Sequence, residues 1–261
     1  MLFEQPLRRP LVALTLAAGL AALPAAQAPQ PPALTVFAAS DLGPAFQMIV
    51  PQFEKKAGAK VTLVLGSTGT LAQQIRNGAP ADLFFAANES AIEEMVPDGL
   101  IIVQTKRRYA RGRVVIITLK SGPVRVNTMQ DLADPGVRRI AIANPAHAPY
   151  GLAAQQALER TNLWEPLRPK LVYGENVQQA VQFVRSGSAE AGIVARSVAE
   201  AADLNWQIVE AKLHEPLNQT AVVLARTKQR RLASSFLDYV DGPQGRGIMR
   251  NVGFLLPGED F

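Results

Sequence analysis

The sequence predicts an α/β fold made of two lobes, in which each lobe is a sheet flanked by helices. Short apolar segments alternate with segments whose apolar residues recur at helical spacing, and this order is typical of βαβ units around a parallel, doubly wound sheet. Two such clusters follow one another in 261 residues, a length that suits one large domain or two of moderate size. No Gly/Ser-rich linker separates the clusters, so we expect extended crossover segments between the lobes.

The first cluster follows a segment rich in Pro, Gln and Ala. Strands are expected at 34–38, 61–65 and 82–86, and helices at 42–57, 70–77 and 90–95. In the first helix, Phe46, Ile49, Val50 and Phe53 share one face, and Gly78 is a typical helix end after the second. The order of strands and helices predicted for this cluster is therefore βαβαβ.

The second cluster repeats the alternation and is followed by a return segment. Strands are expected at 114–119, 139–143, 171–173, 191–195 and 221–225, and helices at 129–133, 150–160, 177–186 and 229–240. We expect the last helix to return to the first lobe. The expected organisation is residues 29–112 with 222–261 for lobe 1 and 113–221 for lobe 2, with hinge crossovers near 109–116 and 218–223.

The N-terminus has the features of a secretory signal peptide. Arg8 and Arg9 precede an apolar stretch at 11–23, and Ala26-Gln27-Ala28 forms a small-x-small cleavage pattern. The stretch is shorter than the about 20 residues that a membrane-spanning helix needs, although an uncleaved anchor is the alternative. We expect residues 1–28 to be removed and the mature protein to be soluble and periplasmic.

Composition narrows the function classes. The net charge of +5, from 27 bases and 22 acids, suits an anionic ligand weakly. Without a stripe of aromatic and basic residues, nucleic-acid binding is not expected. The chain has no cysteine, which excludes disulfides, thiolate metal sites and cysteine nucleophiles. No metal-ligand cluster and no Walker-type loop occur, so we expect no cofactor and no ATP site in this chain.

Four of the expected helices begin directly after a strand with small or hydroxyl residues. These starts lie at 38–42, 66–70, 149–151 and 174–177. Ligands of open parallel sheets bind beyond the carboxyl ends of the strands, and a helix N-terminus offers an anion free N–H groups and partial positive charge. Ser40 and Thr68 add hydroxyl donors. Because such residues also serve simply as N-caps, the spacing alone favours a small-anion site and leaves capping as the alternative.

A resemblance to the periplasmic molybdate-binding protein family makes this more specific. It covers about residues 34 to 256, with the matching segments in the same order along the chain. These segments are Thr35-Val36-Phe37-Ala38-Ala39-Ser40, Gly66-Ser67-Thr68-Gly69-Thr70-Leu71, Gly78-Ala79-Pro80-Ala81-Asp82-Leu83-Phe84, Ile142-Ala143-Asn144-Pro145 with His147-Ala148-Pro149-Tyr150-Gly151, Glu175-Asn176-Val177, Gly192-Ile193-Val194-Ala195, Gly242-Pro243-Gln244 and Gly253-Phe254.

The resemblance implies a two-lobe, type II periplasmic binding protein fold with a hinged cleft. It implies a monomeric binding protein that captures molybdate, or tungstate, and delivers it to the membrane permease of an ABC transporter. The oxyanion contacts carry over to Ser40, Thr68, Tyr150 and the backbone N–H of Val177, with Ser67 in place of Thr68 if the match slips by one residue. Molybdenum is then bound only as molybdate, and no catalytic residue is expected.

Two positions depart from the family pattern or bear on the charge of the site. Some family members have a tyrosine where this sequence has Ala195 and a small residue where it has Tyr150. Either Tyr150 takes over this contact or the oxyanion has one donor fewer. Asp41 follows Ser40 directly. We expect its carboxylate to point away from a dianion, so that only its N–H is a donor.

Selectivity and the alternatives follow from simple chemistry. Molybdate and tungstate are fully deprotonated and need donors only, phosphate keeps a proton and needs an acceptor, and sulfate is smaller.

The runner-up within the class is a binding protein for another oxyanion, such as sulfate. A periplasmic hydrolase using Ser67 lacks a Gly-x-Ser-x-Gly elbow, and a ligand sensor lacks a second module. His147 lies beside the expected site, where we assign it a supporting role.

Overall fold

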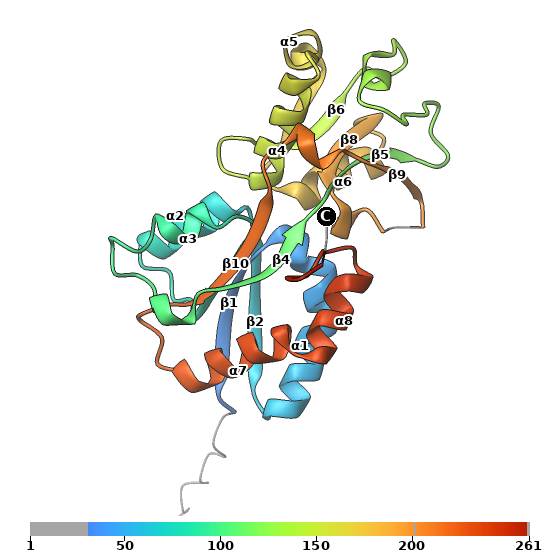
Figure 1. Cartoon of the computed structure of the whole chain (residues 1–261). Helices are drawn as coiled ribbons and strands as arrows, with labels where there is room; N and C mark the ends of the chain where they lie inside the picture. Colours follow the sequence, from blue (N-terminus) through green and yellow to red (C-terminus); the bar gives the residue numbers. More distant parts are fainter. Residues whose placement is uncertain (1–30, 201, 260–261) are drawn as a thin grey trace, which may run out of the picture. The chain divides into compact units, whose positions relative to one another are not determined.

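The computed structural model describes residues 31–200 and 202–259. The expected signal peptide at 1–28 lies outside these residues. Within the described part of the chain, no helix combines the length and the apolar character needed to cross a membrane. The described chain contains two five-stranded sheets with helices packed against them, which confirms the predicted α/β class (Figure 1).

The first sheet collects strands from both ends of the described chain. Its order is β2 (Lys60–Gly66), β1 (Ala33–Ala39), β3 (Leu83–Ala86), β10 (Leu217–Val223) and β4 (Arg107–Gly112). β1 pairs in parallel with β2 and β3, whereas β10 runs antiparallel to β3 and β4. The expectation of a parallel sheet is therefore wrong for the pairs that the returning strand β10 makes with β3 and β4. The helices of this half are α1 (Gly43–Ala57), α2 (Thr68–Arg76), α3 (Ser90–Glu93), α7 (Arg230–Asp241) and α8 (Pro243–Asn251).

The second sheet has the same mixed character. Its order is β7 (Leu171–Gly174), β6 (Ile140–Ala143), β8 (Ala191–Ala195), β5 (Val114–Leu119) and β9 (Leu204–Ile208). β6 is parallel to β7 and β8, and β5 is antiparallel to β8 and β9. Its helices are α4 (Pro149–Arg160), α5 (Trp164–Leu167) and α6 (Val177–Arg185). Short 3-10 turns complete the chain at η1 (Ser40–Leu42), η2 (Val103–Thr105), η3 (Gln130–Ala133), η4 (Arg168–Lys170), η5 (Arg196–Val198) and η6 (Ala211–Leu213).

The elements that the sequence did not predict are mostly edge strands and short helices. β4 and β9 are the last strands of their sheets. Because edge strands are less buried than central ones, they contain polar residues that interrupt the apolar pattern. β10 begins at Leu217, so residues 218–223, expected as a crossover, form a strand of the first sheet. The segment 129–133 contains a 3-10 turn instead of an α-helix. α5 and α8 were not predicted as separate elements.

The two halves have different cores. In the first, aromatic rings pack edge to face, with centroids 5.0 Å apart for Phe46 and Phe85 and 4.9 Å apart for Phe53 and Phe236. The second core consists mainly of buried Val, Ile, Leu and Ala side chains. Each core holds its sheet against its helices, and this fixes the strand ends from which η1, α2, α4 and α6 start.

Candidate functional site

Four helix N-termini meet around one small cavity. η1 and α2 follow β1 and β2 of the first sheet, while α4 and α6 come after β6 and β7 of the second. The cavity is lined by Ala39, Ser40, Asp41, Gly66, Ser67, Thr68, Ala87, Ala148, Pro149, Tyr150 and Val177. About 10 Å³ of it is open to the centre of a water molecule, which is roughly the room of one water. The site is therefore small, and most of the residues that line it are buried.

The five residues expected to contact an oxyanion all line this cavity. Ser40, Ser67 and Thr68 come from the first half, and Tyr150 and Val177 from the second. Each of the five is at most 5% exposed. The structure thus brings together residues that lie far apart in the sequence, and their role as oxyanion contacts stays a prediction.

Two hydroxyl groups are available as donors. The Oγ1 atom of Thr68 accepts a hydrogen bond from the Ala87 N–H at 3.0 Å, so its own proton remains free to donate. No hydrogen bond of the Ser40 hydroxyl is present among the described residues, although the residue is only 3% exposed. A buried hydroxyl without a partner is costly. Both groups are therefore suited to donate to an anion in the cavity.

Ser67 has a different task from Thr68. Its Oγ caps α2 by accepting the Thr70 N–H at 3.4 Å, and it lies 2.8 Å from Thr70 Oγ1 and 2.7 Å from His147 Nδ1. These bonds occupy the hydroxyl within the protein. The geometry therefore favours Thr68 over Ser67 as the donor of this segment.

The start of α6 presents a backbone donor. Asn176 is the N-cap, and its side-chain oxygen accepts the N–H groups of Gln178 at 3.0 Å and Gln179 at 3.2 Å. Val177, the first helical residue, has no acceptor for its N–H within the helix. Because Val177 lines the cavity, this N–H and the positive end of the helix favour an anion there.

Asp41 is the acidic residue among those that line the cavity. It is 1% exposed, and the expectation that its carboxylate points away from a bound dianion stays a prediction. Its Oδ2 accepts a hydrogen bond from Gln219 Nε2, whereas its Oδ1 is buried without a partner among the described residues. Burial raises the pKa of Asp41 to about 6, against the opposing effect of hydrogen bonds from Gln219 and Tyr150.

Tyr150 belongs to the same buried network. Its hydroxyl oxygen accepts from Gln219 Nε2 at 3.0 Å, and its O–H bonds to the Asp41 carboxylate. Gln219 in turn accepts from the Tyr109 hydroxyl at 2.7 Å. Burial and the charge of Asp41 raise the pKa of Tyr150 well above its usual value. The hydroxyl that replaces the family tyrosine is thus already engaged, while Ala195 is buried outside the set of lining residues.

Hydrogen bonds between the two halves surround the cavity. The Gly69 N–H donates to the His147 carbonyl at 2.8 Å, and the Ser197 hydroxyl donates to the Asp41 carbonyl at 2.8 Å. A Cβ atom at residue 69 would lie 2.8 Å from the His147 carbonyl oxygen. A side chain at this position would therefore push the two segments apart, and glycine permits the close approach.

Ser67, His147 and Glu175 form a hydroxyl–imidazole–carboxylate series that a sequence search for a Gly-x-Ser-x-Gly elbow does not detect. His147 Nε2 lies 3.8 Å from Glu175 Oε2, and the Glu175 side chain is 77% exposed. An exposed carboxylate at this distance orients the imidazole weakly. Because the Ser67 hydroxyl also caps α2, the series acts first as a contact between the two halves.

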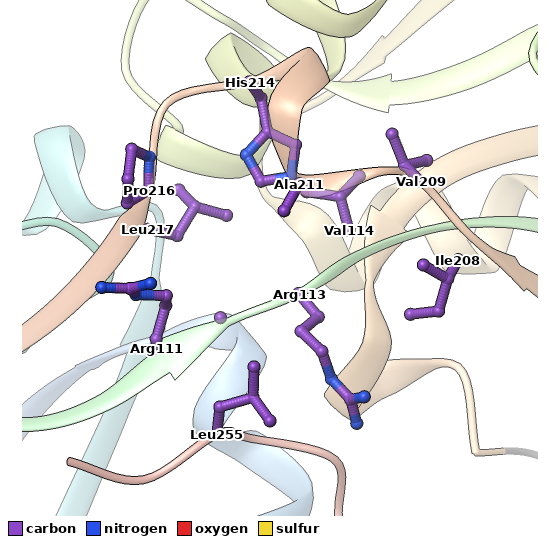
Figure 2. Close-up of a pocket in the computed structure, with 11 residues that line it drawn as sticks. Arg111, Arg113, Val114, Ile208, Val209, Ala211, His214, Pro216, Leu217 and Leu255 are labelled. Carbon is purple, nitrogen blue, oxygen red and sulfur yellow. The ribbon is translucent and has the colours of Figure 1, made fainter. Parts of the chain in front are cut away.

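A larger pocket lies where the chain crosses from β4 to β5 (Figure 2). Its volume is about 310 Å³, and most of its lining is apolar. The side chains of Arg111 and Arg113 extend in different directions in Figure 2. Arg113 Nε donates to the Gly253 carbonyl at 3.0 Å and Arg111 Nε to Asn218 Oδ1 at 3.1 Å. The polar groups do not converge on one point, so the smaller cavity is the better candidate for an oxyanion.

Two α/β halves whose helix N-termini enclose a buried polar cavity are typical of solute-binding proteins. The comparison with family models agrees over nearly the whole described chain, because the model of bacterial extracellular solute-binding proteins matches residues 34–255. The chain belongs to this family. Within the described residues, no group of three or more His, Asp or Glu side chains is placed to hold a metal ion.

Individual relatives are similar over most of their length. The molybdate-binding protein ModA of Azotobacter vinelandii is 37% identical over 246 residues, which cover 92% of this chain and 95% of the relative. The putative ABC transporter substrate-binding lipoprotein YvgL of Bacillus subtilis is 30% identical and covers 85% of each chain. The solved structure of the Azotobacter vinelandii periplasmic molybdate-binding protein has a TM-score of 0.81 at 32% identity, covering 86% of this chain and 99% of that one.

More distant structures share the fold alone. The sulfate-binding protein SubI of Mycobacterium tuberculosis H37Rv has a TM-score of 0.72 at 17% identity, covering 87% of this chain and 88% of that one. The fold is thus confirmed as that of periplasmic binding proteins, and it is compatible with more than one ligand.

Proposed function

We propose that this protein captures molybdate, or tungstate, and delivers it to the membrane permease of an ABC transporter. The observation that carries the proposal is the convergence of uncommitted donors on one buried cavity. The hydroxyls of Ser40 and Thr68 and the N–H of Val177 belong to three different helix starts. Each hydrogen bond to a charged oxyanion contributes about 1.5–3 kcal/mol. The relatives named as molybdate-binding proteins support this choice of anion.

We infer that the two halves are lobes that close around the oxyanion by hinge motion. As the sequence predicts, lobe 1 comprises residues 29–112 with 222–261, and lobe 2 comprises residues 113–221. The second boundary moves by a few residues, because β10 is part of the first sheet from Leu217 onward. The first crossover is short, because only Arg113 separates β4 from β5. A Cβ on Gly112 would lie 2.0 Å from the Tyr150 hydroxyl, so this crossover and the site are in direct contact.

The cellular setting forms part of the proposal. We infer cleavage of a signal peptide near residue 28, a periplasmic location and a monomeric binding protein. Family membership supports an extracytoplasmic location. The partner is a membrane permease that recognises the closed lobes, and nucleic acid is not a ligand.

A hydrolase is the second candidate, and the 2.7 Å contact between Ser67 and His147 is the observation in its favour. A nucleophile needs an open position for the carbonyl that it attacks. Ser67 is 5% exposed, and its hydroxyl already caps α2 by accepting the Thr70 N–H. We therefore assign no catalytic role to Ser67 and propose that the protein is not an enzyme. An ester hydrolysis activity that disappears in Ser67→Ala would reverse this assignment.

The experiment that tests the function is isothermal titration of ligand-free protein starting at residue 29. Molybdate, tungstate, sulfate and phosphate are the four ligands. We expect tight one-to-one binding of molybdate and no heat from sulfate, because a smaller anion leaves buried donors unpaired. Tight binding of sulfate or phosphate instead would keep the oxyanion site and change the substrate. A protein that binds none of the four is not an oxyanion-binding protein.

A further inference from the structure

Asp41 places an acidic group inside a cavity that otherwise offers donors to an anion. The residue lines the cavity beside Ser40 and is 1% exposed, and its Oδ1 has no hydrogen-bond partner among the described residues. An acceptor oxygen that faces neither water nor a donor is rare in folded proteins. A molybdate dianion in this cavity would lie beside the residue that carries this carboxylate.

Within the described residues, Asp41 forms no ion pair. On η5, which packs against η1, Arg196 is paired with Glu200 and stacks on the ring of Trp206 at 4.0 Å. Other titratable groups come from the neighbouring elements. They are Tyr150 from α4, Tyr109 from β4, His147 before α4 and Arg113 between the sheets.

Keeping two neighbouring buried groups negatively charged is costly. Like charges at close range in a site of low dielectric constant repel strongly, and such pairs hold a shared proton instead. We propose that the site takes up one proton from solvent with each molybdate dianion, and that Asp41 holds this proton. The inference rests on the proposed function and specifies its chemistry: the bound species is the oxyanion together with one proton.

The hydrogen-bond network can accommodate this proton. In the ligand-free arrangement, the Tyr150 O–H bonds to the Asp41 carboxylate and its oxygen accepts from Gln219. Once Asp41 is protonated, its own O–H can donate to the oxygen of Tyr150. The Tyr150 O–H is then released to donate to molybdate. One proton therefore removes a repelling charge and frees one donor.

The pH dependence follows from the two protonation states. Burial already raises the pKa of Asp41 to about 6 without ligand, and a bound dianion raises it further. Above about pH 6, the free protein has an ionised Asp41 and must gain a proton on binding. Affinity for molybdate therefore falls about tenfold for each unit of rising pH in this range. Below about pH 6, Asp41 is already protonated and this dependence disappears.

The test is titration with molybdate at pH 7.5 in buffers of different ionisation enthalpy, Tris, HEPES and PIPES. The slope of the observed enthalpy against the ionisation enthalpy gives the number of protons taken up. We expect about one proton per molybdate for the native chain and none for Asp41→Asn. The affinity of Asp41→Asn for molybdate should be independent of pH between 6.5 and 8.5. At pH 8 it should be about a hundredfold higher than the affinity of the native chain.

Asp98→Asn is the matched control. Asp98 lies 3.5 Å from Arg76 on the surface, with its side chain 51% exposed, so this variant has the same charge change and should still take up one proton. Thermal unfolding verifies that both variants are folded. Tight binding of molybdate by the native chain without proton uptake would overturn this inference and leave the proposed function intact. Absence of molybdate binding in the native chain and in Asp41→Asn would overturn both.

Discussion

The two walls of the cavity offer an anion different kinds of group. The wall from the first sheet provides side-chain hydroxyls, those of Ser40 and Thr68, and also the acidic Asp41. The wall from the second sheet provides the backbone N–H of Val177 and the hydroxyl of Tyr150, which is already bonded to Gln219 and Asp41. Side-chain substitutions can thus remove the hydroxyl donors of the first wall, whereas the main donor of the second wall is a backbone N–H.

The two walls are held in place by separate sets of hydrogen bonds. Thr68 is held in place by the Ala87 N–H within its own half of the molecule, so the first wall is organised before the second approaches. The Val177 N–H is organised by the Asn176 cap within the other half. Bonds such as Gly69 to His147 then connect the halves. Each wall is thus organised within its own half, and the bonds between the halves complete the enclosure.

The largest effect is expected from removing both hydroxyls of the first wall. In Ser40→Ala with Thr68→Ala, two charge-assisted donors of about 1.5–3 kcal/mol each are lost. Affinity for molybdate should fall roughly a hundredfold to ten-thousandfold, as measured by isothermal titration. A double variant at exposed positions, Ser186→Ala with Ser188→Ala, should bind like the native chain. Unchanged affinity in the first variant, with a native thermal transition, would remove these residues from the site.

Much of this site could be predicted from the sequence because it lies at helix starts. Strand ends followed by small and hydroxyl residues indicated η1, α2, α4 and α6, and the family resemblance selected Ser40, Thr68, Tyr150 and Val177 among them. Local patterns were sufficient there, since a helix N-terminus is defined by its own few residues. The order of β1, α1, β2, α2 and β3 was predicted for the same reason.

The remaining features depend on contacts distant in sequence. The Asp41 carboxylate is held by Gln219 and Tyr150, which come from other parts of the chain. The edge strand β4 carries Arg107 and Arg108, so its composition does not resemble a buried strand. The choice between Ser67 and Thr68 required the bonds to His147 and Ala87. Such partners are visible only once the fold is assembled.

A smaller effect is expected on the second wall from Val177→Pro. Proline lacks the N–H, and it is well tolerated at the first position of a helix. The preceding Asn176 has φ −155° and ψ 175°, which suits a residue before proline. Loss of one donor to a charged ligand should weaken molybdate binding about tenfold to a hundredfold, measured by titration.

Val177→Ala is the control for this backbone donor. It shortens the same side chain but keeps the N–H. We expect its affinity for molybdate to stay within a few-fold of the native value, because only side-chain packing changes. If alanine weakens binding as much as proline does, the side chain and not the N–H accounts for the effect. The second wall would then contribute by shape alone.

The smallest effect concerns the stability of the first wall without ligand. Burial raises the pKa of Asp41 from 3.8 to about 6, so the folded state binds its proton more tightly than the unfolded state. Ionised Asp41 therefore destabilises the fold, by an amount that is negligible below pH 3.8, grows between pH 3.8 and 6 and is constant above. The shift corresponds to about 2–3 kcal/mol at pH 8. Asp41→Asn should thus unfold at a higher temperature than the native chain at pH 8, with a much smaller difference at pH 4. Asp98→Asn should show no such gain, and an equal gain for Asp41→Asn at both pH values would mean that Asp41 is not ionised in the folded protein.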